Sequence, residues 1–186
     1  MAGTLTVQNI EGPSSGSDAN KVIIPSGQTL DVSGGTMLPS AGQIVQVVYS
    51  SKRTVASDST TTTMAEISSD YRISLTPKFS NSVIVLGFQA AFNVGDATRM
   101  AVDFMVGTAS DYTSMSRIDT TSVNESVRIG GATNAAHRYT LRQYYTLNSL
   151  DTRYFTMYFG RAMGSGTCRV NDNSGAAFLT AMEVAQ

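Results

Sequence analysis

Apolar residues recur at every second position over most of the chain after residue 44, and this alternation limits the fold more than any other feature. In residues 82–94 the even positions include Ile84, Leu86, Phe88, Phe92 and Val94, whereas odd positions 87, 89, 91 and 93 hold Gly, Gln, Ala and Asn. Successive side chains of a β-strand point to opposite faces, so a period of two predicts a strand with one buried face. No stretch shows the convincing three-and-four spacing of an amphipathic helix.

The same alternation recurs in six further segments, which are residues 45–49, 71–75, 99–106, 138–147, 153–159 and 178–184. Turn clusters rich in Gly, Asn, Asp and Ser separate them. Half-buried strands joined by such turns favour antiparallel sheets that pack face to face. We therefore predict an all-β fold, with an antiparallel, jelly-roll-like β-sandwich head over residues 41–186.

The first 48 residues differ from the rest because they contain no Phe, Tyr or Arg. Large rings supply much of the apolar area of a small core, so a segment without them can hardly stabilise itself. It is nevertheless patterned, since short alternating stretches lie between turns that contain Gly. We predict that residues 1–40 form a strand-and-turn arm or stalk that depends on partner chains for its order. The alternative is a flexible Gly/Ser/Pro arm. The expected assembly residues are Leu5, Val7, Val22, Ile24, Leu30 and Val32.

The residues that usually carry chemistry are scarce, with one cysteine, Cys168, and one histidine, His137. A single cysteine excludes an intrachain disulfide, a four-cysteine zinc site and a CxxC redox pair. Its neighbours predict that Cys168 is a strand residue facing the core. A thiol nucleophile paired with His137 is the alternative, but no Gly-x-Ser-x-Gly elbow or orienting carboxylate accompanies it. We predict no catalytic residue, no cofactor and no enzymatic activity.

Acidic and amide side chains also fail to form a recognisable site. Asp96, Asp103, Asp111 and Asp119 are seven or eight residues apart, which follows the rhythm of turns and strands rather than the paired carboxylates of a glycosidase. The stretch at 171–175 offers oxygen ligands of the kind that bind Ca²⁺, but no acidic residue closes the loop as in an EF-hand. We predict a simple turn there and no metal site, with calcium as the alternative.

The charge balance excludes other classes of partner. There are 13 Lys and Arg against 14 Asp and Glu, which gives a net charge of −1, so nothing draws the chain to nucleic acid or a membrane surface. The chain has no apolar run of about 18 residues, and its start does not resemble a secretory signal. We expect synthesis in a cytosol and no membrane insertion. Every Arg follows residue 52, and Arg is enriched in protein interfaces, which favours pairing between chains.

Several stretches resemble a known class of proteins. The N-terminal motif NKVIIPSGQTLDVS (residues 20–33) is similar to shaft pieces of tailed-bacteriophage fibre and virion structural proteins. The later ISLTPKFSNSVIV (residues 73–85) and AMEV (residues 181–184) are similar to the β-rich heads that follow such shafts. The resemblance covers nearly the whole chain. It implies a virion protein made in the host cytoplasm, a homotrimeric fibre or spike that is anchored by its N-terminus, contacts other virion proteins and attaches to the host.

The length of 186 residues is short for a host-recognising tail fibre, so a capsid decoration, head-fibre or cement protein that stabilises the shell is the alternative. A remoter alternative is a lectin-like module that binds host glycans, because exposed aromatics on β-sandwiches bind sugars. The chain offers no Trp for this, but it has Tyr49, Tyr112, Tyr144, Tyr154 and Tyr158. A host surface glycan or protein would be contacted by loops such as residues 109–117 and 120–126, and no individual receptor-binding residue is assigned.

Overall fold

The computed structural model describes residues 11–17, 19, 21–28, 39–52, 57–95, 98–118, 127–130, 136–171 and 176–186. The chain divides into two compact units, Met1–Leu38 and Pro39–Gln186. The described residues of the first unit contain turns and no assigned strand, so the strands of the expected arm stay a prediction. Val22 and Ile24 are exposed, and the other four expected assembly residues lie outside the described residues, namely Leu5, Val7, Leu30 and Val32.

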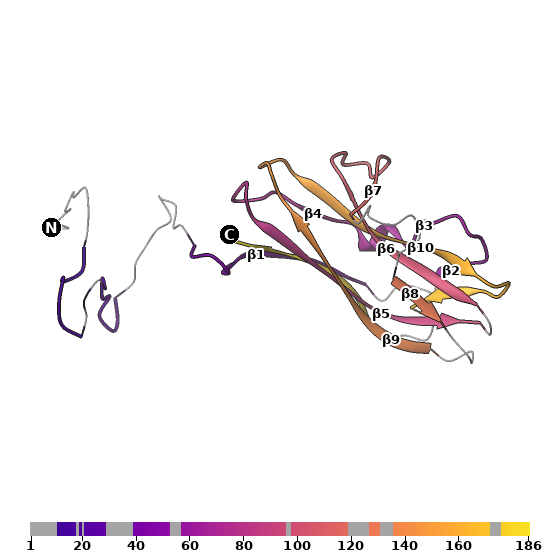
Figure 1. The fold of residues 1–186 in the computed structure, drawn as a ribbon, viewed down its shortest axis with the longest axis horizontal. Helices are drawn as coiled ribbons and strands as arrows, with labels where there is room; N and C mark the ends of the chain where they lie inside the picture. The colour runs from indigo at the N-terminus through magenta and orange to yellow at the C-terminus, as the bar shows by residue number, and fades with distance from the viewer. Residues whose placement is uncertain are drawn as a thin grey trace. The chain divides into compact units, whose positions relative to one another are not determined.

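The second unit is built from two antiparallel sheets (Figure 1). In its described part, sheet A has six strands in the order β1-β12-β5-β11-β2, with β9 paired to the other side of β5. The long strands β1, β12, β5 and β9 lie side by side and form most of the sheet. The strand bounds are β1 Ile44–Lys52, β2 Ser57–Ser59, β5 Val83–Val94, β9 Ala136–Thr146, β11 Cys168–Val170 and β12 Ala177–Val184.

Sheet B also has six strands among the described residues, in the order β3-β10-β6-β7, with β4 paired to β10 and β8 paired to β6. The bounds are β3 Ala65–Glu66, β4 Ile73–Leu75, β6 Arg99–Gly107, β7 Ser116–Arg117, β8 Val127–Gly130 and β10 Arg153–Met163. One short 3-10 helix, η1 (Ser69–Tyr71), is the only helical element in the part of the chain that the structure describes. The prediction of an all-β fold is therefore confirmed, and the jelly-roll arrangement stays a prediction.

Side chains from both sheets form one buried cluster. Phe88 of β5 is fully buried, and its ring meets Tyr71 edge-on at 5.3 Å. Tyr145 of β9 meets Phe155 of β10 edge-on at 5.9 Å, so this contact joins sheet A to sheet B. Burial of one large side chain contributes roughly 1.5–3 kcal/mol. The shared core therefore holds the two sheets together.

The alternation predicted from the sequence is confirmed in β5 and β10, which pair with other strands on both sides. In β5 the even residues 84–94 are all buried, and in β10 Phe155, Met157 and Phe159 are buried. Strand β1 behaves differently, because Val47 is 50% exposed and Tyr49 is 69% exposed. The apolar row of this strand points away from the core, while Val48 packs against the core.

A buried carboxylate joins the turn before β5 to the last strand. Glu183 of β12 is fully buried and accepts hydrogen bonds from Lys78 N, Phe79 N and Ser82 Oγ at 2.8 to 3.0 Å. Gln46 Nε2 of β1 donates to its other oxygen at 2.5 Å. Burial by itself raises the pKa of Glu183, but these four donors outweigh it and hold the pKa below the ordinary value of 4.5.

Candidate functional site

The face of sheet A that points away from the core is made of alternate residues of four strands. The strand registers place two rows across β1, β12, β5 and β9, one of Val47, Met182, Val85 and Tyr144, and the next of Tyr49, Thr180, Gly87 and Arg142. We call these eight residues the open face. The first row is apolar from one edge of the sheet to the other, apart from the hydroxyl of Tyr144.

The two ends of these rows are open to solvent. Tyr49 is 69% exposed and Tyr144 is 63% exposed, and they lie on the two outermost long strands. In the described part of the chain, β1 pairs only with β12, and β9 pairs only with β5. Among the described residues, each of these strands therefore has one edge without a strand partner, and each carries an exposed tyrosine. Contiguous apolar surface at an open edge is typical of sites that contact another protein.

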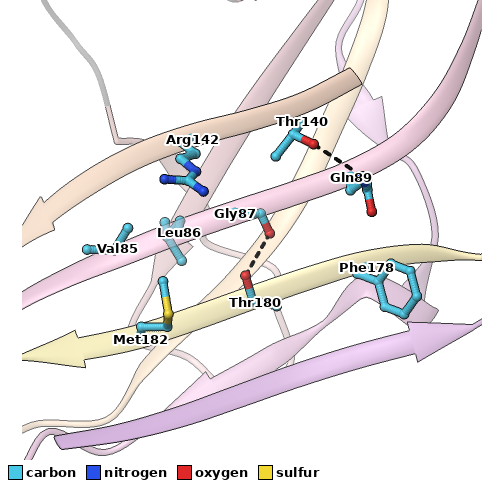
Figure 2. A pocket seen from close by; sticks show the side chains of 9 residues that line it. All are labelled: Val85, Leu86, Gly87, Gln89, Thr140, Arg142, Phe178, Thr180 and Met182. Carbon is cyan, nitrogen blue, oxygen red and sulfur yellow. Dashed lines mark hydrogen bonds between the residues drawn. The ribbon is translucent and has the colours of Figure 1, made fainter. Parts of the chain in front are cut away.

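A groove of about 300 Å³ lies in the middle of the open face (Figure 2). Val85, Phe178 and Met182 supply its apolar walls. Polar groups come from Thr140 and Arg142 of β9, and Gln89 Nε2 donates a hydrogen bond to Thr140 Oγ1 at 3.3 Å. The groove therefore combines apolar walls with a cation and hydrogen-bonding groups along one side.

Gly87 makes the floor of this groove possible. A Cβ at position 87 would lie 2.9 Å from Thr180 Oγ1 on the neighbouring strand. Without that Cβ, the Thr180 hydroxyl approaches the strand and donates to Gly87 O at 3.2 Å. A larger residue at 87 would displace Thr180 and fill the groove.

The charge on the open face is positive. The four long strands contain one acidic residue, Glu183, and its carboxylate is buried on the core side. Arg142 lies in the groove, and Arg138, four residues away on the same side of β9, is exposed. An anionic or hydrogen-bonding partner is therefore favoured over a cationic one.

The outward side of sheet B is different because the chain itself covers it. Thr156 of β10 is fully buried there and donates to Glu66 Oε1 at 2.7 Å, and Glu66 also binds Arg72 through two hydrogen bonds of 2.8 and 2.7 Å. Burial raises the pKa of Glu66, but Arg72 and Thr156 outweigh it and lower the pKa below 4.5. The guanidinium of Arg72 lies 4.7 Å from the ring centre of Tyr112.

Tyr112 belongs to the loop between β6 and β7, and its φ of 62° is unusual for a bulky residue. Its ring packs edge-on against Tyr154 at 5.4 Å, and Arg72 lies over it. These contacts offset the backbone strain. Of the five tyrosines considered for sugar binding, the structure thus brings Tyr112 and Tyr154 together on sheet B. It places Tyr49 and Tyr144 on the open face of sheet A, and Tyr158 beside Glu66 in the register of β10 and β3.

Cys168 lies in the core, as its sequence neighbours predict. Its side chain is fully buried, and its Sγ lies 3.9 Å from Arg99 O. Burial raises the pKa of the thiol, which disfavours the nucleophilic thiolate. His137 is an exposed residue of β9 whose ring meets Tyr139 at 6.4 Å.

The four regularly spaced aspartates do not share one site as far as they are described. Asp103 pairs with Arg117 at 2.7 Å, and Asp111 accepts from the Thr113 backbone and hydroxyl in a local turn. Asp96, Asp119 and residues 172–175 of the candidate calcium loop lie outside the described residues. Within the described ranges, no three His, Cys, Asp or Glu side chains gather as metal ligands. The one helix described there is too short to cross a membrane.

Sequence reasoning did not find the open face. The available signal was a strand that is apolar on both sides. In β12, Leu179 and Ala181 face the core, while Phe178 and Met182 are on the opposite side. A strand that is apolar on both sides indicates that other residues cover both of its faces. Recognising the site also needed the register, which brings Val47 of β1 and Tyr144 of β9 into the same row.

No protein-family model and no curated protein sequence matches this chain. Among solved structures, this chain is similar to a chain in the structure of the infectious bursal disease virus Gt strain. The two chains are 11% identical, and the match covers 88% of this chain and 43% of the viral chain at a TM-score of 0.41. It is also similar to the infectious bursal disease virus VP2 subviral particle, with 14% identity over 94% of this chain and 46% of that chain, at a TM-score of 0.39. This chain thus spans less than half the length of those chains. At such TM-scores the likeness says nothing about function.

Proposed function

We propose that this chain is a non-enzymatic structural protein of a virion. In this proposal it is a homotrimeric fibre or spike, with an N-terminal arm over residues 1–40 that anchors it and a jelly-roll-like β-sandwich head that attaches to the host. The observation that carries the proposal is the open face of sheet A. Its exposed tyrosines, its apolar groove and its two open strand edges are features of a surface that contacts protein.

The residue types of the open face support protein contact over small-molecule chemistry. Tyr, Met and Arg are enriched in interfaces, and Tyr and Arg dominate the energetic centres of many of them. Tyr49, Met182, Arg142 and Tyr144 lie within two adjacent rows. The nucleophile candidate, in contrast, is buried with a raised pKa. The residue types on the open face therefore fit an assembly role better than a catalytic one.

Capsid decoration is the second candidate function, and the two open edges favour it. Strands β1 and β9 lie at opposite lateral edges of the long-stranded part of sheet A. Each copy could therefore contact one neighbouring copy at each edge within a shell. A fibre would concentrate its contacts along one axis, whereas a decoration protein would spread them over the capsid lattice. The same surface supports both, and its position on a particle distinguishes them.

The direct test is to look for the chain in purified virus particles by mass spectrometry and to locate it by cryo-electron microscopy. The proposal expects trimeric projections whose bases contain the N-terminal segment. Copies distributed over the shell would support decoration instead of a fibre. Absence of the chain from particles that package genomes normally would overturn the virion role.

Glycan binding is supported by one feature, the exposed ring of Tyr144 on the same face of sheet A as Arg142, Thr140 and Gln89. An exposed ring beside hydrogen-bonding groups suits a sugar. A glycan array probed with the full chain tests it, with Tyr144→Ala as the variant expected to lose signal and Tyr112→Ala as the control on the other sheet. An array without binding would remove this alternative.

A further inference from the structure

Exposed large hydrophobic side chains are concentrated at two places. Of the ten in the described residues, three follow one another in the N-terminal unit and four lie on or beside the open face, which is seven in all. The first group is Val22, Ile23 and Ile24, and the second is Ile44, Val47, Tyr49 and Tyr144. One chain thus carries two separate apolar surfaces that its own core does not bury.

The first surface lies in residues 21–28, to which the structure assigns no strand. All eight residues 21–28 are exposed, and the segment ends in a turn in which Gln28 N donates to Pro25 O at 3.0 Å and Gly27 has a φ of +81°. Pro25 restricts Ile24 to extended conformations. In an extended chain, Val22 and Ile24 point to one side and Ile23 to the other. The segment therefore offers one apolar side formed by two β-branched residues.

We propose that residues 21–28 of one copy dock into the groove on the open face of a second copy. Val22 and Ile24 then lie over the floor at Gly87, between the exposed rings of Tyr49 and Tyr144. This inference rests on the proposed assembly function and names the partner, which is another copy of the same chain. The groove is largely apolar and no described residue outside its own strands lines it, and the described residues 21–28 are all exposed.

Charge supports the same pairing. Residues 1–38 contain one cation, Lys21, against Glu11, Asp18 and Asp31, which gives them a net charge of −2. Arg142 lies on one side of the groove, and the four strands around it expose no acidic side chain. Residues 21–28 themselves carry one charge, that of Lys21, but the N-terminal unit around them is net acidic and is therefore attracted to the face that carries Arg142, whereas two grooves facing each other would bring two Arg142 side chains together.

The geometry of exchange also limits the assembly. Each copy gives one segment and accepts one, so the contact is heterologous, running from one copy to the next. Such contacts close into a ring when the rotation allows it, and three copies would form the proposed trimer. Reciprocal exchange between two copies would form a dimer.

Sedimentation velocity of the full chain tests the docking. We expect concentration-dependent association that weakens by about tenfold or more in the double variant Val22→Asp, Ile24→Asp and in Arg142→Glu. The matched controls are Ile23→Asp, on the other side of the segment, and Arg138→Glu, which makes the same charge change outside the groove. Both should associate like the parent chain. Circular dichroism and thermal melting identify any variant that has not folded.

Mixing experiments separate exchange between copies from docking within one chain. The double variant keeps an intact groove and Arg142→Glu keeps an intact segment, so an equimolar mixture should recover one contact and form a one-to-one dimer. As a second readout, a chain with Ile24→Cys and a separate chain with Thr180→Cys should form a disulfide under an added mild oxidant such as oxidised glutathione. Docking within one chain would give neither result and would overturn the proposal.

The outcomes also distinguish this inference from the proposed function. A parent chain that stays monomeric at roughly 100 µM, far above the Kd of a specific interface, refutes the docking. Association that survives both the segment variant and the groove variant refutes it as well. Neither result affects the virion role, which depends on finding the chain in particles.

Discussion

Replacing Glu183 should destabilise the protein more than any other single polar substitution in its described part. The carboxylate is fully buried and accepts from Lys78 N, Phe79 N, Ser82 Oγ and Gln46 Nε2. Because these donors come from the turn before β5 and from β1, one side chain connects three separate segments. Its loss leaves several buried donors unpaired at once.

The size of the effect follows from counting those donors. Hydrogen bonds to a charged group contribute about 1.5–3 kcal/mol each, neutral ones about 0.5–1.5, and a buried donor left unpaired costs about 1–3 kcal/mol. Glu183→Gln keeps the volume but makes the bonds neutral and turns one acceptor into a donor, so we expect a loss of about 2–3 kcal/mol. Glu183→Ala leaves the donors unpaired beside a cavity, and we expect about 4–5 kcal/mol.

Urea unfolding at constant protein concentration measures these losses. The matched control is Glu66→Gln, because Glu66 also accepts from several groups but keeps 19% of its side chain exposed and pairs with a partly exposed Arg72. Screening by solvent limits that pair, so we expect a loss of about 1 kcal/mol. If Glu183→Gln lies within about 0.5 kcal/mol of the parent chain, as exposed substitutions do, the reasoning is wrong.

The pH dependence provides a second check. The folded pKa of Glu183 is lower than its ordinary value of 4.5, so its stabilising contribution is complete above that value and is lost as the pH falls through the folded pKa. The difference in the free energy of unfolding between the parent chain and Glu183→Gln should therefore shrink on acidification from about pH 6 to about pH 3. A difference that stays constant would show that the pKa of Glu183 is the same in the folded and unfolded chain, and a difference that grows would show that the carboxyl is protonated in the fold.

Three further predictions concern the core and the groove. Phe88→Ala should lower the free energy of unfolding by about 3–5 kcal/mol in urea melts, whereas Leu150→Ala, which truncates an exposed side chain, should stay within about 0.5 kcal/mol. Gly87→Ala should lower the melting temperature because its Cβ meets Thr180 Oγ1 at 2.9 Å, while Gly130→Ala, whose nearest neighbour is 3.9 Å away, should not; equal effects would contradict the tight approach of Thr180. Cys168 should resist iodoacetamide in the native protein and react fully in urea, and rapid native labelling would show that the thiol is accessible.

The sequence predicted the strands well because alternation records the contrast between a buried and a solvated face. The buried side chains of β5 and β10, such as Phe88 and Phe155, follow it directly. It also indicated that Cys168 faces the core. Alternation could not show which apolar row of a doubly apolar strand is inside, and for this reason the outward position of Val47 and Tyr49 appears only in the structure.

The candidate site was harder to predict because it depends on pairing between distant segments. Tyr49 and Tyr144 are almost a hundred residues apart in sequence, and only the order of β1, β12, β5 and β9 brings their rows together. Gly87 shows the same limit, since a glycine within a strand suggests close approach but does not identify Thr180 as the neighbour. Val22 and Ile24 were predicted to be assembly residues from alternation alone, and their exposure leaves that prediction open to test.

The two outer faces of the second unit pose opposite physical problems. On sheet B, the buried Thr156 donates to Glu66, which pairs with Arg72, and Arg72 in turn lies over the ring of Tyr112. On sheet A, no described segment of the chain covers the row from Val47 to Tyr144. A net charge of −1 supplies little repulsion between whole copies, so overall charge does not keep them apart at high concentration. A chain with this face and this charge should associate, and an apolar groove with an arginine beside it makes that association selective for an apolar, net-acidic partner.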